Sequence, residues 1–163
     1  MTDDTLVDFA VVAFREDEQW QVAALPPRAA ENLDGFVATV RQQPSEGVAL
    51  GLSSVGDDFF LAVRPHGAGV RLLLSDATAA GEWPVAQQAL DLIEEALPDE
   101  DDDSEQVAPV GDLTIFRDLG VSAMEVTALC GDLELYPDEM LGQIAARIGF
   151  GHQFDKAVDA DLV

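Results

Sequence analysis

The chain has 163 residues, of which 48% are apolar and 25% charged, and its formal net charge is −24. The apolar share supports a buried core and argues against a disordered protein, and the single cysteine, Cys130, excludes an internal disulfide. A field of this sign repels nucleic-acid phosphates and anionic lipid headgroups, so we expect no direct nucleic-acid binding, no membrane association and a preference for basic protein partners. The alternative is that the charge serves solubility alone.

The N-terminal residues and the short length of the apolar runs predict a cytoplasmic protein. The opening residues, MTDDTLVDF, have no basic segment ahead of an apolar stretch, so we expect no secretory signal. No apolar run approaches the roughly 20 residues that a membrane span needs. One cysteine fits a reducing compartment.

The first quarter of the chain predicts a hairpin followed by a helix. Residues 5–14, rich in β-branched and aromatic side chains, and residues 20–25, which alternate in polarity, read as paired strands. Apolar residues at helical spacing begin at Ala29, and Pro44 marks the end of this helix.

Three further strands and a second helix complete a predicted domain over residues 1–96. The strands cover 48–55, 58–64 and 70–75, with a glycine-containing turn at 65–69. Pro84 opens the helix, whose expected buried stripe is Val85, Ala89, Leu92, Ile93 and Ala96. The order ββαβββα predicts an α+β fold with an antiparallel sheet. This order resembles the roadblock, longin and profilin-like folds, a likeness of topology that implies no activity.

Residues 97–109 read as an acidic linker. Positions 97–106 hold six carboxylates and no basic residue, and like charges extend a chain. The run does not match a calcium-binding EF-hand loop, because counting from Asp99 puts Ser104 where glycine is needed and Val110 where glutamate is needed. Contact with a basic partner is the main alternative, and a specific metal site is the other.

Residues 110–163 predict a small all-helical C-terminal module. Ser122 and Glu125 have the spacing of a capping box, flanked by Val121 and Val126 as a hydrophobic staple. A second helix begins at Tyr136-Pro137, and Gly149 suits its C-terminal end. So short a module is marginal alone, so we expect it to pack on the first domain or on a partner.

The sequence predicts no catalytic, cofactor or metal site. It contains no GxGxxG, GxxxxGK[ST], HExxH or GxSxG pattern. One cysteine and two histidines, His66 and His152, make a zinc centre improbable, and Cys130 reads as a small apolar residue in a helix interface. We therefore expect a protein that is not an enzyme.

Several short segments resemble a known family. The hairpin DFAVVAFREDEQWQV and the acidic insertion match it, and residues 111–154 carry its most telling pieces: Asp118-Leu119-Gly120, Leu135-Tyr136-Pro137-Asp138-Glu139 and Ile148-Gly149-Phe150-Gly151. The chain is in these respects similar to the actinobacterial tRNA adenosine deaminase-associated protein family, over nearly its whole length. The resemblance implies association with such a deaminase and supplies no catalytic residues.

Two main hypotheses follow. The first is a non-catalytic partner or regulator of a tRNA adenosine deaminase that acts through an acidic surface; the second is a general, homodimeric, roadblock-like interaction module unrelated to tRNA. An enzyme that uses surface carboxylates and a divalent metal is a third reading, with no motif in its favour.

Six residues are candidate partner contacts. The exposed charges of Asp101, Asp102 and Asp103 have no evident role in the fold. Aromatic residues often carry binding energy, and three of them flank the C-terminal helix: Tyr136, Phe150 and Phe154. Core packing is the alternative for these three.

Overall fold

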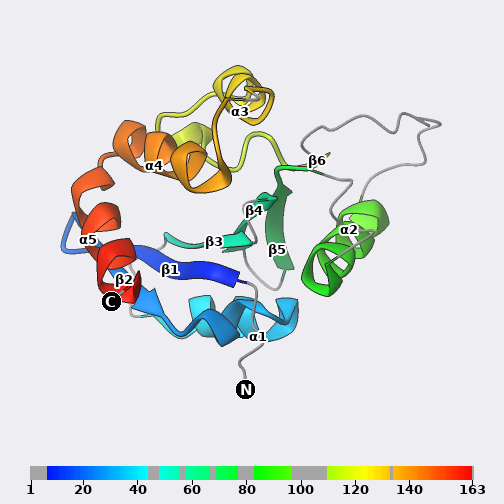
Figure 1. Cartoon of the computed structure of the whole chain (residues 1–163), viewed down its shortest axis with the longest axis horizontal. Helices are drawn as coiled ribbons and strands as arrows, with labels where there is room; N and C mark the ends of the chain where they lie inside the picture. Colours follow the sequence, from blue (N-terminus) through cyan, green and yellow to red (C-terminus); the bar gives the residue numbers. More distant parts are fainter. Residues whose placement is uncertain are drawn as a thin grey trace.

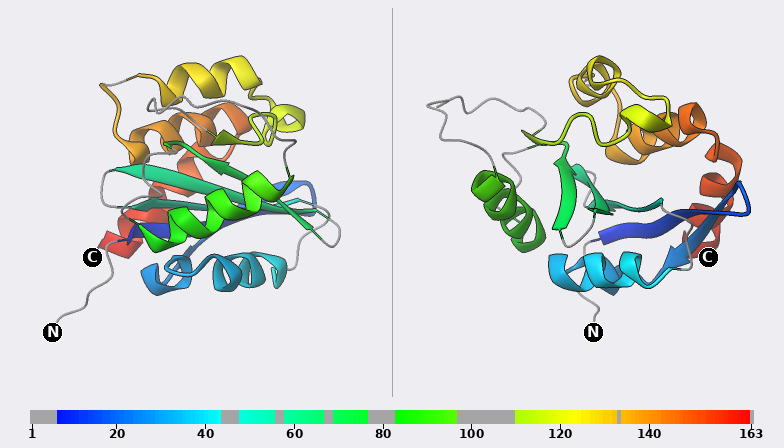
Figure 2. Two further views of the ribbon diagram at one scale, coloured as in Figure 1. Left: turned by 90° about the vertical axis from the view of Figure 1, so that its right-hand side faces the viewer. Right: turned by 180° about the vertical axis from the view of Figure 1, so that it is seen from behind.

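The sheet at the centre of the molecule confirms the predicted α+β class. The computed structural model describes residues 7–43, 48–55, 58–66, 69–76, 83–96, 110–132 and 134–162. In these ranges the strands form one antiparallel sheet of order β2-β1-β3-β4-β5-β6. Helices cover both of its faces (Figures 1 and 2).

The first half of the chain has the predicted order ββαβββα. Its elements are β1 (Val7–Glu16), β2 (Gln19–Leu25), the 3-10 helix η1 (Pro27–Ala30), α1 (Leu33–Arg41), β3 (Ala49–Val55), β4 (Phe59–His66), β5 (Gly69–Leu74) and α2 (Pro84–Ala96). The strands β4 and β5 extend into the predicted 65–69 turn. Pro65 is tolerated in β4 because the β3–β4 pairing has already ended at Val63, so no neighbour on that side needs its missing N–H.

The second half contains one strand that the sequence did not reveal. Its elements are β6 (Val110–Gly111), the 3-10 helix η3 (Arg117–Leu119), α3 (Ala123–Cys130), α4 (Pro137–Ile148) and α5 (Gly151–Leu162). The expectation of an all-helical segment is therefore wrong at β6, which pairs with β5. Gly111 permits this pairing: its φ is +112°, and a Cβ there would lie 2.3 Å from the Leu72 carbonyl oxygen.

The caps predicted for the C-terminal helices are confirmed. The Ser122 hydroxyl accepts from the Glu125 N–H at 3.1 Å, and the Glu125 carboxylate accepts from the Ser122 N–H at 2.9 Å. Gly149 ends α4 with a φ of +122°. Val121 and Val126, the expected staple, are both buried in one core cluster.

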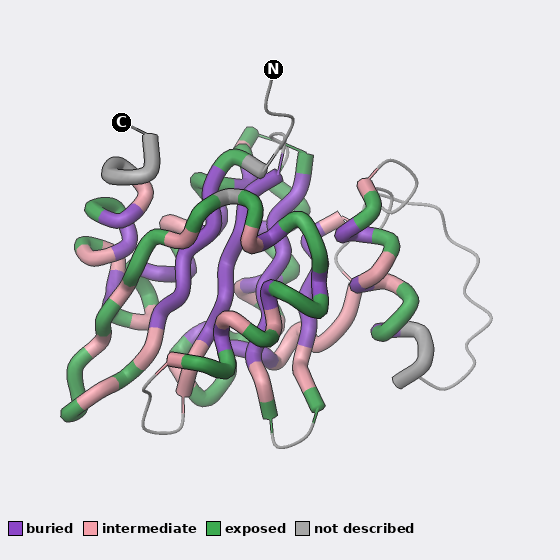
Figure 3. Tube along the Cα trace, turned by 90° about the horizontal axis from the view of Figure 1, so that it is seen from below, coloured by how far each residue is buried: buried purple, intermediate pink, exposed green. Residues whose placement is uncertain are grey.

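Each face of the sheet carries its own buried layer of side chains. The central strands β3 and β4, between these layers, are buried along most of their length (Figure 3). Alternate side chains of β1 separate in the way a pleated strand requires: Phe9 and Val11 face α3, α4 and α5, whereas Ala10 and Val12 face α1 and α2. The C-terminal helices thus pack on the sheet, one of the two arrangements expected for them. The expected linker, 97–109, lies outside the described residues. The buried stripe expected for α2 is wrong at Leu92, which is exposed, whereas Ala86, which was not expected in the stripe, is buried.

The turn between β1 and β2 carries local strain. Its two central residues, Asp17 and Glu18, have φ values of 54° and 65°, which glycine adopts more readily than other residues do. We expect Glu18→Gly to raise the free energy of unfolding by about 1 kcal/mol, because it removes the strain of a side chain in the left-handed region. Urea denaturation followed by circular dichroism measures this. Equal or lower stability of the variant would contradict a strained turn.

Candidate partner-binding surface

An exposed aromatic side chain lies where the α3–α4 loop meets α4. The Tyr136 side chain is 60% exposed. Its backbone is fixed by the first turn of α4, because its N–H donates to the Glu139 carboxylate at 2.9 Å and its carbonyl accepts from the Glu139 and Met140 N–H groups. An exposed ring on a backbone held in this way is suited to binding, since little conformational freedom is lost on contact.

Carboxylates surround Tyr136 in the sequence and on the surface. Asp132, Glu134 and Asp138 are all exposed, and residues 131–139 contain no basic residue. The Asp132 carboxylate accepts from the Glu134 N–H at 3.0 Å and so fixes the loop in a turn. We call Asp132, Glu134, Tyr136 and Asp138 the Tyr136 surface.

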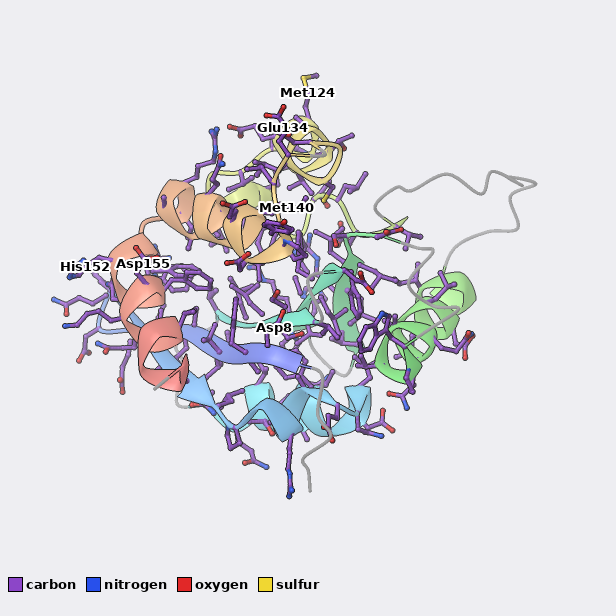
Figure 4. The ribbon with its side chains drawn as sticks, viewed as in Figure 1. Asp8, Met124, Glu134, Met140, His152 and Asp155 are labelled. Atoms are coloured by element: carbon purple, nitrogen blue, oxygen red, sulfur yellow. The ribbon has the colours of Figure 1, made fainter. Side chains whose placement is uncertain are left out.

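The outer side of α3 adds an apolar element. Met124 is 80% exposed and points away from the rest of the molecule in Figure 4, where Glu134 also lies on the outer side of the C-terminal helices. The helix is held at its N-terminal end by the ion pair between Glu125 and Arg147 of α4. Exposed Met beside charged residues is common where proteins bind one another.

The other two candidate aromatics belong to the core. The Phe150 residue is fully buried, with its ring 4.9 Å from that of Trp20, and the buried Phe154 ring meets that of Phe9 edge-on at 5.7 Å. Both rings therefore pack in the core, which was the alternative interpretation for them. Asp101, Asp102 and Asp103 lie outside the described residues.

The one cysteine of the chain, Cys130, is buried. Burial raises the pKa of the Cys130 thiol to about 12, so it stays protonated at neutral pH and is a poor nucleophile. His66 and His152 are both exposed. Within the described ranges no three His, Cys, Asp or Glu side chains group in a way that would hold a metal ion. None of the helices placed by the structure combines the length and apolar character needed to cross a membrane.

Two arginines fasten residues 112–118 to the sheet, a feature that the sequence reading missed. Arg64 of β4 donates to both carboxylate oxygens of Asp118 at 2.8 Å and to the Ile115 carbonyl at 2.7 Å. Arg71 of β5 donates to Asp112 at 2.6 Å and to the Thr114 carbonyl at 2.9 Å. The two arginines are paired across the strands, so the carboxylates also offset their mutual repulsion.

The two arginines lower the pKa of both carboxylates that they contact. Hydrogen bonds from Arg64 hold the pKa of the Asp118 carboxyl below its ordinary value of 3.8. Burial opposes ionisation of Asp112, but hydrogen bonds from Arg71 and Thr114 outweigh it and lower the pKa of that carboxyl. Both groups therefore favour the folded state when they are ionised.

We expect Asp118→Asn to lower the free energy of unfolding by about 1 kcal/mol at pH 7, a modest cost because the Asp118 side chain is 58% exposed. A lowered folded-state pKa contributes stability above the unfolded pKa and loses it as the pH falls through the folded value. The difference between the two proteins should therefore shrink as the pH falls below 3.8 and through the lowered pKa of Asp118 in the folded protein. Urea melts at several pH values measure this difference; one that stays constant down to pH 2 would contradict the ion pair.

Comparison with known proteins gives one family. A family model described as "Rv3753c-like tRNA adenosine deaminase-associated protein" matches residues 8–151. "Protein Rv3753c" of Mycobacterium tuberculosis (strain ATCC 25618 / H37Rv) is 35% identical to this chain over 156 residues, which cover 96% of this chain and 90% of that protein. No solved structure matches the chain.

Proposed function

Because the chain belongs to the Rv3753c-like tRNA adenosine deaminase-associated protein family, we propose that it is a non-catalytic partner of a tRNA adenosine deaminase. Zinc-dependent deaminases of nucleic acids hold their metal and move protons with H-x-E and P-C-x-x-C motifs. One cysteine cannot make P-C-x-x-C, and the two histidines, His66 and His152, are followed at the third motif position by Ala68 and Phe154, so this chain has neither motif. Its part in deamination is then to bind the enzyme, and this role places it in the cytoplasm with tRNA.

The Tyr136 surface supports this role. A deaminase that binds tRNA needs a basic face for the phosphates, and the acidic Tyr136 surface is complementary to such a face. Tyr136 would act as the anchor that is buried in the complex, with Asp132, Glu134 and Asp138 around it at the rim. We propose Asp101, Asp102 and Asp103 as further contacts to the deaminase on the ground of their charge alone. We propose that this protein and tRNA compete for the enzyme.

The single observation that carries the proposal is the exposed Tyr136 among carboxylates in a chain of net charge −24. Its test is to mix the protein with the deaminase of the same organism and measure the mass of the complex by light scattering on a sizing column. We expect a complex at low salt that added tRNA displaces and high salt weakens. A complex that keeps tRNA bound would make the protein an accessory subunit that does not compete. No complex at low salt would rule out the proposed role.

The second candidate, a homodimeric interaction module, is favoured by one separate observation. The strand β2 lies at an edge of the sheet, where a further strand can pair. Pairing at this edge does not depend on the deaminase.

A further inference from the structure

Most of the outer edge of β2 lacks the features that usually protect an edge strand; only at its start does a side chain of α5, Gln153, donate to the Trp20 carbonyl. The seven residues of β2, QWQVAAL, include no charged residue, proline or glycine. Ala23 and Ala24 are exposed, and α5 packs against one face of the strand beside this edge (Figures 1 and 2). An open, uncharged edge in a protein of net charge −24 is where close approach of another strand costs least.

The hairpin geometry identifies the backbone groups that face outward. The two-residue turn makes Glu16 and Gln19 the pair that exchanges hydrogen bonds next to the loop, and the pattern alternates along β2. The N–H and C=O groups of Trp20, Val22 and Ala24 therefore point away from β1. Two hydrogen bonds agree with this alternation. The Arg15 N–H points toward β3 and donates to the Val48 carbonyl, and the outward-facing Trp20 carbonyl accepts from the Gln153 side chain at 3.2 Å.

We propose that β2 pairs antiparallel with β2 of a second copy of the chain, about a two-fold axis at Ala23. In this register Val22 of each copy exchanges two hydrogen bonds with Ala24 of the other, and the two Ala23 residues lie directly opposite each other. The sheets of the two copies would become one continuous sheet. The pairing depends only on outward-facing groups, so it leaves the β1–β2 ladder unchanged.

The neighbouring residues fit this register better than they fit a slipped one. Trp20 of one copy comes opposite Pro26 of the other, and proline has no N–H to give to the Trp20 carbonyl. Gln153 already supplies that donor. Beyond this pair the chain leaves the strand for η1, and the two-fold axis would bring the exposed Glu18 of one copy to the same end of the pairing as the exposed Arg28 of the other, which gives two complementary charge pairs.

The overall charge determines how strong the dimer is and how it responds to salt. Four backbone hydrogen bonds make a small interface, so we expect a dissociation constant on the order of 0.1 mM at high salt. Two copies of net charge −24 repel each other, and salt screens that repulsion over about 10 Å at 0.1 M but only about 3 Å at 1 M. Added salt should therefore tighten the dimer, whereas it should weaken the proposed deaminase complex.

The test is sedimentation equilibrium of the full chain up to about 1 mM protein, at low and at high salt. Ala23→Glu would set two carboxylates opposite each other at the axis and should weaken the dimer at least about tenfold, while the matched Ala23→Gln should leave it unchanged. Because Ala23 is exposed, both variants should keep the wild-type melting temperature. Glu18→Arg and Arg28→Glu should each weaken the dimer severalfold, and the double variant should restore it.

A protein that stays monomeric at high salt and about 1 mM, or a dimer that Ala23→Glu does not weaken, would overturn the inference. If Ala23→Glu instead abolishes the deaminase complex and the free protein is monomeric, the edge binds a strand of the deaminase; the second copy is then the wrong occupant, while the proposed function stands. A dimer with the expected variant pattern and no deaminase complex would leave the inference standing and remove the proposed function.

Discussion

Arg64→Ala is expected to lower the free energy of unfolding by about 3 kcal/mol, because it removes a nearly buried arginine together with its three hydrogen bonds. The variant leaves the carbonyl of the fully buried Ile115 without its donor and removes both hydrogen bonds to Asp118. This expected loss of stability lies at the lower end of the range for breaking a buried ion pair, because the Asp118 side chain is 58% exposed and remains hydrated. Residues 112–118 would then lose one of the two arginines that fasten them to the sheet.

Urea denaturation followed by circular dichroism measures this loss. Arg117→Ala is the matched control: this arginine lies in the same segment and is exposed, so we expect a change within about 0.5 kcal/mol. If Arg64→Ala proved no more costly than Arg117→Ala, the ion pair would not fasten the segment as described.

Tyr136→Ala is expected to weaken binding to the tRNA adenosine deaminase by about 2 kcal/mol, roughly 30-fold in the dissociation constant. This follows from the proposed function, in which the ring is the anchor of the contact. The free energy of unfolding should change by less than about 0.5 kcal/mol, because the side chain is 60% exposed in the free protein.

Isothermal titration calorimetry at low salt compares the variants. Tyr136→Phe keeps the exposed ring and removes only its hydroxyl, so it should bind nearly as well as the wild type. Unchanged affinity of Tyr136→Ala would mean that the Tyr136 surface is not the contact, even if the two proteins bind.

Much of the fold could be predicted because its signals are local. The strands β1 to β5 follow from alternation and β-branched composition, and the capping box at Ser122 from a four-residue spacing. The strand β6 could not be predicted because a strand of two residues shows no periodicity. Its only sign in the sequence is Gly111, and the need for a positive φ at that residue depends on the close approach of β5. The arginines of β4 and β5 did interrupt apolar strands, a signal that a buried ion pair was needed.

The candidate contacts show where local reasoning stops. Tyr136, Phe150 and Phe154 all flank the C-terminal helices, and nothing in the neighbouring residues tells an exposed ring from a buried one. Phe150 is buried because Trp20, far away in the sequence, stacks on it, and Gln153 reaches the same strand. Such long-range packing determines which side chains are exposed. The exposure of Tyr136 is therefore visible only once the sheet and helices are assembled.

The measurement that tests the central claim most directly is the dissociation constant for this protein and the tRNA adenosine deaminase of the same organism, as a function of salt. An acidic partner that docks on a basic face should bind at low salt, with an affinity that falls steadily as salt rises from about 0.05 to 0.5 M. Absence of binding at the lowest salt, or an affinity that salt does not change, would contradict a partner that acts through its acidic surface.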